Sequence, residues 1–152
     1  MMAAAALAAA AQAKESAPVA LLHGVNGSCG QVQSWVDMIA ESIDHEAVVK
    51  CVEVGDGETT SMFEQMKWQA ATVCHKLHND PDFDGKEINL IGISQGGLIA
   101  RTVVERCSDL QIDTLYTFGG PHNGVSVYRK CVKWWCPFAN HILGYLAEFA
   151  IV

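Results

Sequence analysis

Apolar residues gather along the chain in two alternating patterns, short continuous runs and runs with helical spacing. The continuous runs, typical of strands buried on both faces of a sheet, cover residues 18–24, 47–54, 87–93 and 112–118. Between them, apolar residues recur at the spacing of a helix face over residues 32–43, 61–77 and 98–107. That spacing predicts an amphipathic helix over each of these stretches.

The alternation of strands and helices predicts an α/β fold, in which a mostly parallel sheet carries helices on both faces. Ser61 and Glu64 form a candidate capping box for the second helix, and Asn79-Asp80-Pro81 ends that helix. A further helix is expected over residues 138–152. No internal repeat or linker divides residues 19–152, which we therefore assign to a single domain.

Composition supports a folded domain and excludes some classes of binding partner. The chain has 152 residues, of which 50% are hydrophobic and 18% are charged, unlike a disordered chain and enough for a buried core. Its net charge is −7 and Lys and Arg do not cluster, so nucleic acid and anionic membrane surfaces are not expected partners. No stable membrane span is expected, because no apolar stretch is long enough to cross a bilayer.

Cysteine usage indicates an oxidising compartment. The chain has six cysteines and no C-x-x-C pair, which favours disulfide bonds over a zinc site. His75 and His78 lie beside Cys74 in a pattern that some metal sites share. A solvated polar helix face explains these histidines as well, and no metal is expected.

The start of the chain fits a signal peptide in part. Residues 1–13 are almost all alanine and end in Ala11-Gln12-Ala13, which has the small-x-small form of a cleavage site. No basic residue precedes the apolar run, and the run is short. A low-complexity alanine start on a cytosolic protein is therefore the alternative interpretation.

Candidate chemistry centres on Gly92-Ile93-Ser94-Gln95-Gly96, where the third strand turns into its helix. A G-x-S-x-G motif in this context predicts a nucleophile elbow, in which glycines leave room for a serine with a strained backbone. Ser94 is therefore the candidate catalytic nucleophile. The alternative is a glycine-rich turn with a passive serine.

Acyl transfer from such a serine needs donors that stabilise an oxyanion. The predicted donors are the backbone N–H of Gln95 and that of Val25, in the loop after the first strand. The residues expected to support these loops are Gly24, Gly96 and His122. An ordinary strand-to-helix turn is the alternative for His23-Gly24. Serine acyl transfer needs no metal or organic cofactor, and none is expected.

An acid and a base for Ser94 are harder to place. In this architecture they follow the serine in chain order. The acids after Ser94 are Glu105, Asp109, Asp113 and Glu148, and the histidines are His122 and His141. Asp109 and Asp113 flank the start of the fourth strand, at the end of the sheet opposite the site. A base normally enters from a strand later than the one before His122, so the residues indicate a nucleophile and an oxyanion hole but no convincing acid or base.

Several blocks of residues follow one another in a distinctive order and spacing. They are Leu22-His23-Gly24 with Ser28-Cys29, Gly92 to Gly97, Arg106-Cys107, and Gly119 to Val125. In this arrangement the chain, from about Val19 to its end, resembles the palmitoyl-protein thioesterases, which are α/β-hydrolases. The resemblance implies hydrolysis of thioesters between long-chain acyl groups and protein cysteines. It also implies a lysosomal, vacuolar or secreted setting, with S-palmitoylated proteins as partners.

The resemblance implies roles for single residues too. Ser94 matches the family nucleophile, and Gln95 and Val25 match its oxyanion positions. The implied disulfides are Cys74–Cys107 and Cys131–Cys136. The pairing of Cys29 with Cys51 stays open, because Cys29 matches a family cysteine whereas Cys51 is an addition.

Members of the family are longer than this chain and carry their catalytic Asp and His in a C-terminal half. The resemblance therefore implies the N-terminal half of an α/β-hydrolase, C-terminally truncated, with the catalytic Asp and His beyond residue 152. Very low thioesterase activity is the expectation for this chain alone, because the groups that activate the serine are not visible in it.

Two other functions stay open. One is a lipase or carboxylesterase with the same elbow, because Gly120-Pro121-His122-Asn123-Gly124 suits lipases as well. The other is a non-catalytic lipid-binding module. Relative turnover of thioesters and oxyesters separates the first from a thioesterase, and labelling of Ser94 by a fluorophosphonate separates the second.

Overall fold

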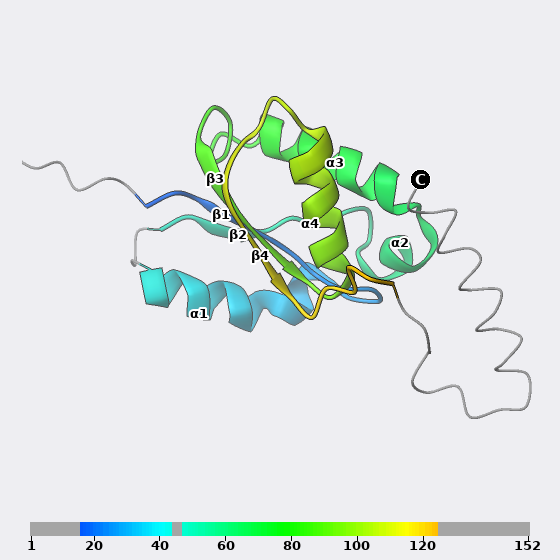
Figure 1. Ribbon diagram of the computed structural model, residues 1–152. Helices are drawn as coiled ribbons and strands as arrows, with labels where there is room; N and C mark the ends of the chain where they lie inside the picture. The colour runs from blue at the N-terminus through cyan, green and yellow to red at the C-terminus, as the bar shows by residue number, and fades with distance from the viewer. Residues whose placement is uncertain (1–15, 44–46, 125–152) are drawn as a thin grey trace, which may run out of the picture.

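The computed structural model describes residues 16–43 and 47–124. Within them the strands form one parallel sheet, in the order β2-β1-β3-β4 (Figure 1). The strands are β1 (Val19–Leu22), β2 (Val49–Cys51), β3 (Glu87–Ile93) and β4 (Gln111–Phe118). The expected leader at 1–13, the Cys131–Cys136 bridge and the helix over 138–152 lie outside the described residues.

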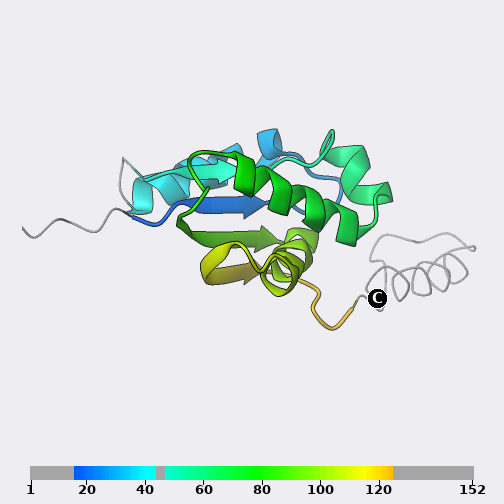
Figure 2. The ribbon, with the colours of Figure 1, turned by 90° about the horizontal axis from the view of Figure 1, so that it is seen from above.

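Helices cover both faces of the sheet, as the view from above shows (Figure 2). They are the short 3-10 turn η1 (Cys29–Val32) and the helices α1 (Gln33–Ile43), α2 (Glu58–Phe63), α3 (Met66–Asn79) and α4 (Gln95–Arg106). α1 packs on one face, whereas α3 and α4 pack on the other. The predicted α/β class, with a parallel sheet between helices, is confirmed.

β1 contributes to both hydrophobic cores. Val19 and Leu21 join the core under α1, and Ala20 and Leu22 join the core under α3 and α4. Successive side chains of a strand point to opposite faces, so a strand covered on both sides must be apolar at every position. This is why the strand appears in the sequence as a continuous apolar run.

The second predicted helix, over residues 61–77, forms two helices, and the prediction of a capping box is wrong. Ser61 lies inside α2, and Glu64 after it is extended, with φ −84° and ψ 142°. The side-chain amide of Gln69 donates to the carbonyl oxygens of Glu64 and Thr60, at 2.8 and 3.3 Å. Those bonds satisfy acceptors at the end of α2, and they form only when α3 folds back against it.

The second strand is shorter than the apolar run over 47–54 predicts. β2 is the edge strand next to β1, and the N–H of Val52 still donates to the carbonyl of Leu21 at 2.9 Å. Glu53 then leaves the sheet, and its side chain turns to the loop after β1.

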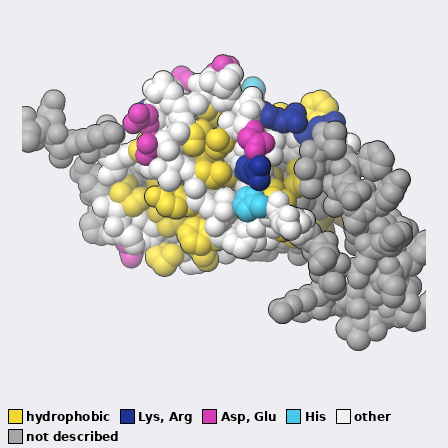
Figure 3. All heavy atoms as spheres, viewed as in Figure 1, with side chains coloured by type: hydrophobic (Ala, Val, Ile, Leu, Met, Phe, Trp, Pro, Cys, Tyr) yellow, Lys and Arg dark blue, Asp and Glu magenta, His cyan; other side chains and the backbone are white. Residues whose placement is uncertain are grey.

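β4 forms the other edge and buries one of its two faces. Ile112 and Leu115 pack against the core under α4, while Tyr116 and Phe118 are 51% and 48% exposed. Trp35 of α1 meets Phe118 edge to face, with ring centroids 5.7 Å apart. Hydrophobic side chains therefore gather on this side of the molecule (Figure 3), along an open groove that does not include Ser94. No helix in the described part of the chain is long and apolar enough to cross a membrane.

Candidate active site

Ser94 lies between β3 and α4 with a backbone that non-glycine residues rarely adopt. Its φ is 55° and its ψ is −120°. Its N–H donates to the carbonyl of Phe118 at 2.8 Å, and its carbonyl accepts from the N–H of Gly97 at 3.0 Å. The strand, the sharp turn and the helix are the context that a nucleophile elbow requires.

Two glycines allow the strands and α4 to approach one another at this turn. A Cβ built on Gly96 would collide with the carbonyl oxygens of Leu22 and His23 at the end of β1. One built on Gly92 would collide with the backbone of Gly97. The close backbone contacts therefore require glycine at both positions.

The loop after β1, residues 24–28, lies against the serine. A Cβ on Gly24 would stand 3.1 Å from the Cβ of Ser94 and 3.6 Å from its Oγ. Val25 follows in the same loop with 43% of its surface exposed, and Gln95 is the first residue of α4. Ser94, the candidate nucleophile, and both residues expected to donate to an oxyanion therefore lie on adjoining segments.

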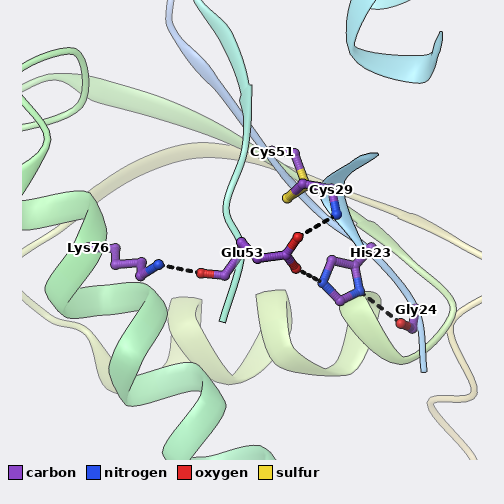
Figure 4. The surroundings of a disulfide bond; sticks show 6 residues. All are labelled: His23, Gly24, Cys29, Cys51, Glu53 and Lys76. Atoms are coloured by element: carbon purple, nitrogen blue, oxygen red, sulfur yellow. Dashed lines mark hydrogen bonds and ion pairs between the residues drawn. A yellow bond between two sulfur atoms is a disulfide. The ribbon is translucent and has the colours of Figure 1, made fainter. Parts of the chain in front are cut away.

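One carboxylate that the sequence analysis did not single out holds both ends of this loop (Figure 4). Glu53 Oε1 lies 2.6 Å from Nε2 of the buried His23, before the loop. Its Oε2 accepts from the N–H of Cys29, after the loop, at 2.6 Å. The sequence does contain a signal for the contact between Glu53 and His23. The carboxyl ends of neighbouring parallel strands meet at one edge of the sheet, and Glu53 follows β2 as His23 follows β1.

Two disulfides join the described residues. Cys29 pairs with Cys51, the pairing left open above, with Cα atoms 5.5 Å apart. Cys74 of α3 pairs with Cys107 after α4, as the resemblance implies, with Cα atoms 6.2 Å apart. The Cys74 sulfur is therefore not available to a metal, and no group of His, Cys, Asp or Glu within residues 16–43 and 47–124 could hold one. The disulfides fit a protein of the secretory pathway.

The comparison with known proteins identifies the family of this chain. The family model of the palmitoyl protein thioesterases matches residues 18–150. The chain belongs to that family. Palmitoyl-protein thioesterase 3 of Dictyostelium discoideum is 36% identical over 107 residues, which are 70% of this chain and 36% of the relative. Palmitoyl-protein thioesterase 1 of Caenorhabditis elegans is 27% identical over 79% of this chain and 42% of the relative.

The chain thus spans less than half of the length of these thioesterases. Solved structures with a similar fold include a lipase and a lipase-esterase related protein. A Bacillus licheniformis lipase in its mature form has a TM-score of 0.62 and 19% identity, over 87% of this chain and 52% of that one. A lipase-esterase related protein of Clostridium acetobutylicum has a TM-score of 0.56 and 17% identity, over 88% and 54%. At these identities the likeness shows the α/β-hydrolase fold alone.

In this thioesterase-family chain, no histidine of the described segments is hydrogen-bonded to the Ser94 hydroxyl. The exposed His122 has its Nε2 3.1 Å from the Oγ1 of Thr117 instead. The described acids after Ser94 lie elsewhere. Glu105 pairs with Arg101 on α4, and Asp109 and Asp113 flank the first residue of β4. His141 and Glu148 lie outside the described residues.

Proposed function

We propose that this chain is part of a serine hydrolase that cleaves long-chain acyl thioesters from protein cysteines. The observation that carries the proposal is Ser94 at φ 55° between β3 and α4, with Gly24 against its side chain. A strained serine at such a turn is the setting of the nucleophile in α/β-hydrolases. The family match, over residues 18–150, supports a thioester as the substrate.

In the proposed reaction, Ser94 Oγ attacks the thioester carbonyl carbon while a base takes the hydroxyl proton. The N–H groups of Gln95 and Val25 donate to the resulting oxyanion, where a single donor is worth about 3–4 kcal/mol. The C–S bond then breaks, the cysteine thiol leaves with the proton, and water hydrolyses the acyl-serine ester. In this proposal no histidine or acid of residues 1–152 activates Ser94, so we expect low turnover from this chain alone.

The proposed substrates are S-palmitoylated proteins or peptides and other long-chain acyl thioesters. A lysosomal, vacuolar or secreted setting is proposed with them, because disulfides persist in oxidising compartments. The alanine-rich residues 1–13 would then act as the signal peptide. The reaction as proposed uses no cofactor.

Labelling by a fluorophosphonate tests Ser94 as the nucleophile. We expect slow covalent labelling of the wild-type chain and none of Ser94→Ala, because the probe reacts with an activated serine. Ser108→Ala is the matched control, since Ser108 is an exposed serine beyond α4, and it should label like the wild type. Labelling that survives Ser94→Ala would refute the assignment of the nucleophile.

Hydrolysis of a palmitoyl thioester and of the matching oxyester tests the reaction. We expect Ser94-dependent turnover that favours the thioester, in keeping with the family. Residual catalysis about 10³–10⁴-fold over water is the scale that an oxyanion hole alone supports. Preference for the oxyester would instead indicate a lipase or carboxylesterase. Fatty-acid binding without any labelling would indicate a lipid-binding module.

A further inference from the structure

α2 reaches the candidate site through one buried serine. Ser61 is 3% exposed, and its Oγ accepts from the N–H of Asn26 at 2.8 Å, in the loop after β1. The same hydroxyl donates to the carbonyl of Glu58 at 2.9 Å, so its single proton and one lone pair are both used. Asn26 directly follows Val25, one of the two proposed oxyanion donors.

The carbonyl oxygen of Ser61 contacts the other side of the site. It accepts from the side-chain Nε2 of Gln95 at 2.9 Å. The Oε1 of that amide is buried and has no partner within the described residues, so the bond to Ser61 is the one that orients the side chain. Gln95 also supplies the second proposed oxyanion donor, through its backbone N–H.

Ser61 is itself held rigidly. The preceding residue, Thr60, donates its N–H to Asp56 Oδ1 at 2.8 Å. Gln69 of α3 binds the carbonyls of Thr60 and Glu64 on the two sides of Ser61. A buried residue whose neighbours are bonded to its own helix and to α3 is a suitable reference point for the two proposed donors.

We propose that Ser61 is a positioning residue that sets the separation of the two oxyanion donors. This inference rests on the proposed function, and Ser61 itself touches neither substrate nor reacting atoms. Its role follows from its two contacts, one to the loop that carries Val25 and one to the residue that follows Ser94. Donors stabilise an oxyanion only within a narrow range of distances, so a small displacement of either lowers the rate.

The contact with Asn26 explains why the hydroxyl of Ser61 matters for the position of the loop after β1. The φ of Asn26 is 55°, in the left-handed region that asparagine adopts more readily than most other residues besides glycine, and contacts of its backbone help to hold it there. The bond from its N–H to Ser61 Oγ is one such contact. Ser61→Ala removes that acceptor, takes away the partner of the Asn26 N–H, and lets the loop with Val25 relax.

The rate of labelling by a fluorophosphonate tests this inference, because its product also places an oxygen in the oxyanion hole. For Ser61→Ala we expect the maximal labelling rate to fall about tenfold, with the probe concentration at half-maximal rate within about twofold of wild type. Ser61→Thr, which restores the hydroxyl, should recover most of the rate. Ser42→Ala is the matched control, because Ser42 Oγ also donates to a backbone carbonyl, on the remote α1.

Gln95→Met provides a second route should Ser61→Ala fail to fold. It keeps the backbone donor of residue 95 and breaks the bond to the Ser61 carbonyl, so the labelling rate should fall while probe binding is retained. Wild-type rates in folded Ser61→Ala or Gln95→Met, or a loss confined to probe binding, would overturn the inference while leaving the proposed function intact. An unlabelled wild-type chain would instead overturn the proposed function, and this inference with it.

Discussion

At the scale of single residues, the candidate site depends on glycines, which have no side chain, as much as on Ser94. Gly24 brings the first loop against Ser94, and Gly96 lets α4 start directly over the end of β1. Ser94 itself has φ 55° and ψ −120°, a backbone conformation that fits a nucleophile elbow. A Cβ at Gly96 would collide with the Leu22 carbonyl oxygen, so that position requires glycine, whereas a Cβ at Gly24 would make a tight contact with Ser94.

Substitution of Gly96 tests this argument. Gly96→Ala should lower the free energy of unfolding by about 1–3 kcal/mol and slow Ser94 labelling, because the new Cβ displaces the end of β1 or the start of α4. Gly30→Ala is the control, because nothing lies within 4 Å of its added Cβ, and it should leave stability equal or raise it by about 0.4–1 kcal/mol. Urea unfolding measures both, and equal midpoints for the two variants would contradict the packing argument.

At the scale of elements, an ion-pair cluster joins the edge strand β2 to the turn after α3. Nζ of Lys50 donates to both carboxylate oxygens of Asp80, at 2.9 and 2.8 Å, and lies 2.5 Å from Oδ2 of Asp82. The hydrogen bond with Asp80 is the main cause that raises the pKa of Lys50. The hydrogen bond from Lys50 is likewise the main cause that lowers the pKa of Asp80.

These shifts predict how stability depends on pH. The pKa of Asp80 is lowered in the folded state. Its contribution to the free energy of unfolding is therefore present above the unfolded pKa of about 3.9 and is lost as pH falls through the folded pKa. Because the groups are partly exposed, Lys50→Met should cost about 0.5–1 kcal/mol at neutral pH and progressively less in acid. Lys67→Met, on the exposed side of α3, is the control for loss of one positive charge. A difference between wild type and Lys50→Met that stays constant down to pH 2 would rule out this coupling.

At the scale of the whole molecule, one disulfide lies on each side of the sheet. Cys51 packs with the core under α1, and Cys74 and Cys107 pack with the core under α3 and α4. The bridges close loops with sequence separations of 22 and 33 residues. Both therefore restrict the unfolded chain, but only Cys29–Cys51 borders the loop that lies against Ser94.

Removing each disulfide in turn tests whether its effect on the free energy of unfolding is distinct from its effect on the labelling rate of Ser94. Replacing either pair by alanine should lower the free energy of unfolding by about 3–4 kcal/mol, from the loop lengths. Only Cys29→Ala/Cys51→Ala should also slow labelling of Ser94 in the folded protein, because it frees the end of the loop after β1. Equal slowing by Cys74→Ala/Cys107→Ala, measured where both variants are folded, would mean that the effect is not local.

Much of the fold could be predicted from the sequence because its signals are local. The apolar runs predicted the bounds of β1, β3 and β4 to within one or two residues, and the helical spacing predicted α1. The break between α2 and α3 was missed, since the carbonyls at the end of α2 bind the side-chain amide of Gln69 in the next helix, which helical spacing does not reveal. The prediction of a capping box was wrong for a related reason, because Ser61 binds the loop after β1 and Gln95 instead.

The sequence by itself determined the α/β class and the family and marked Ser94 as the candidate nucleophile, because apolar periodicity and the order of motifs can be recognised along the chain. Only the tertiary structure decided which distant groups meet there: Glu53 at both ends of the first loop, Ser61 between that loop and Gln95, and the pairing of Cys29 with Cys51. These contacts join residues 22 to 35 positions apart. They exist because parallel strands bring the loops after their carboxyl ends to one edge of the sheet, which no local pattern encodes.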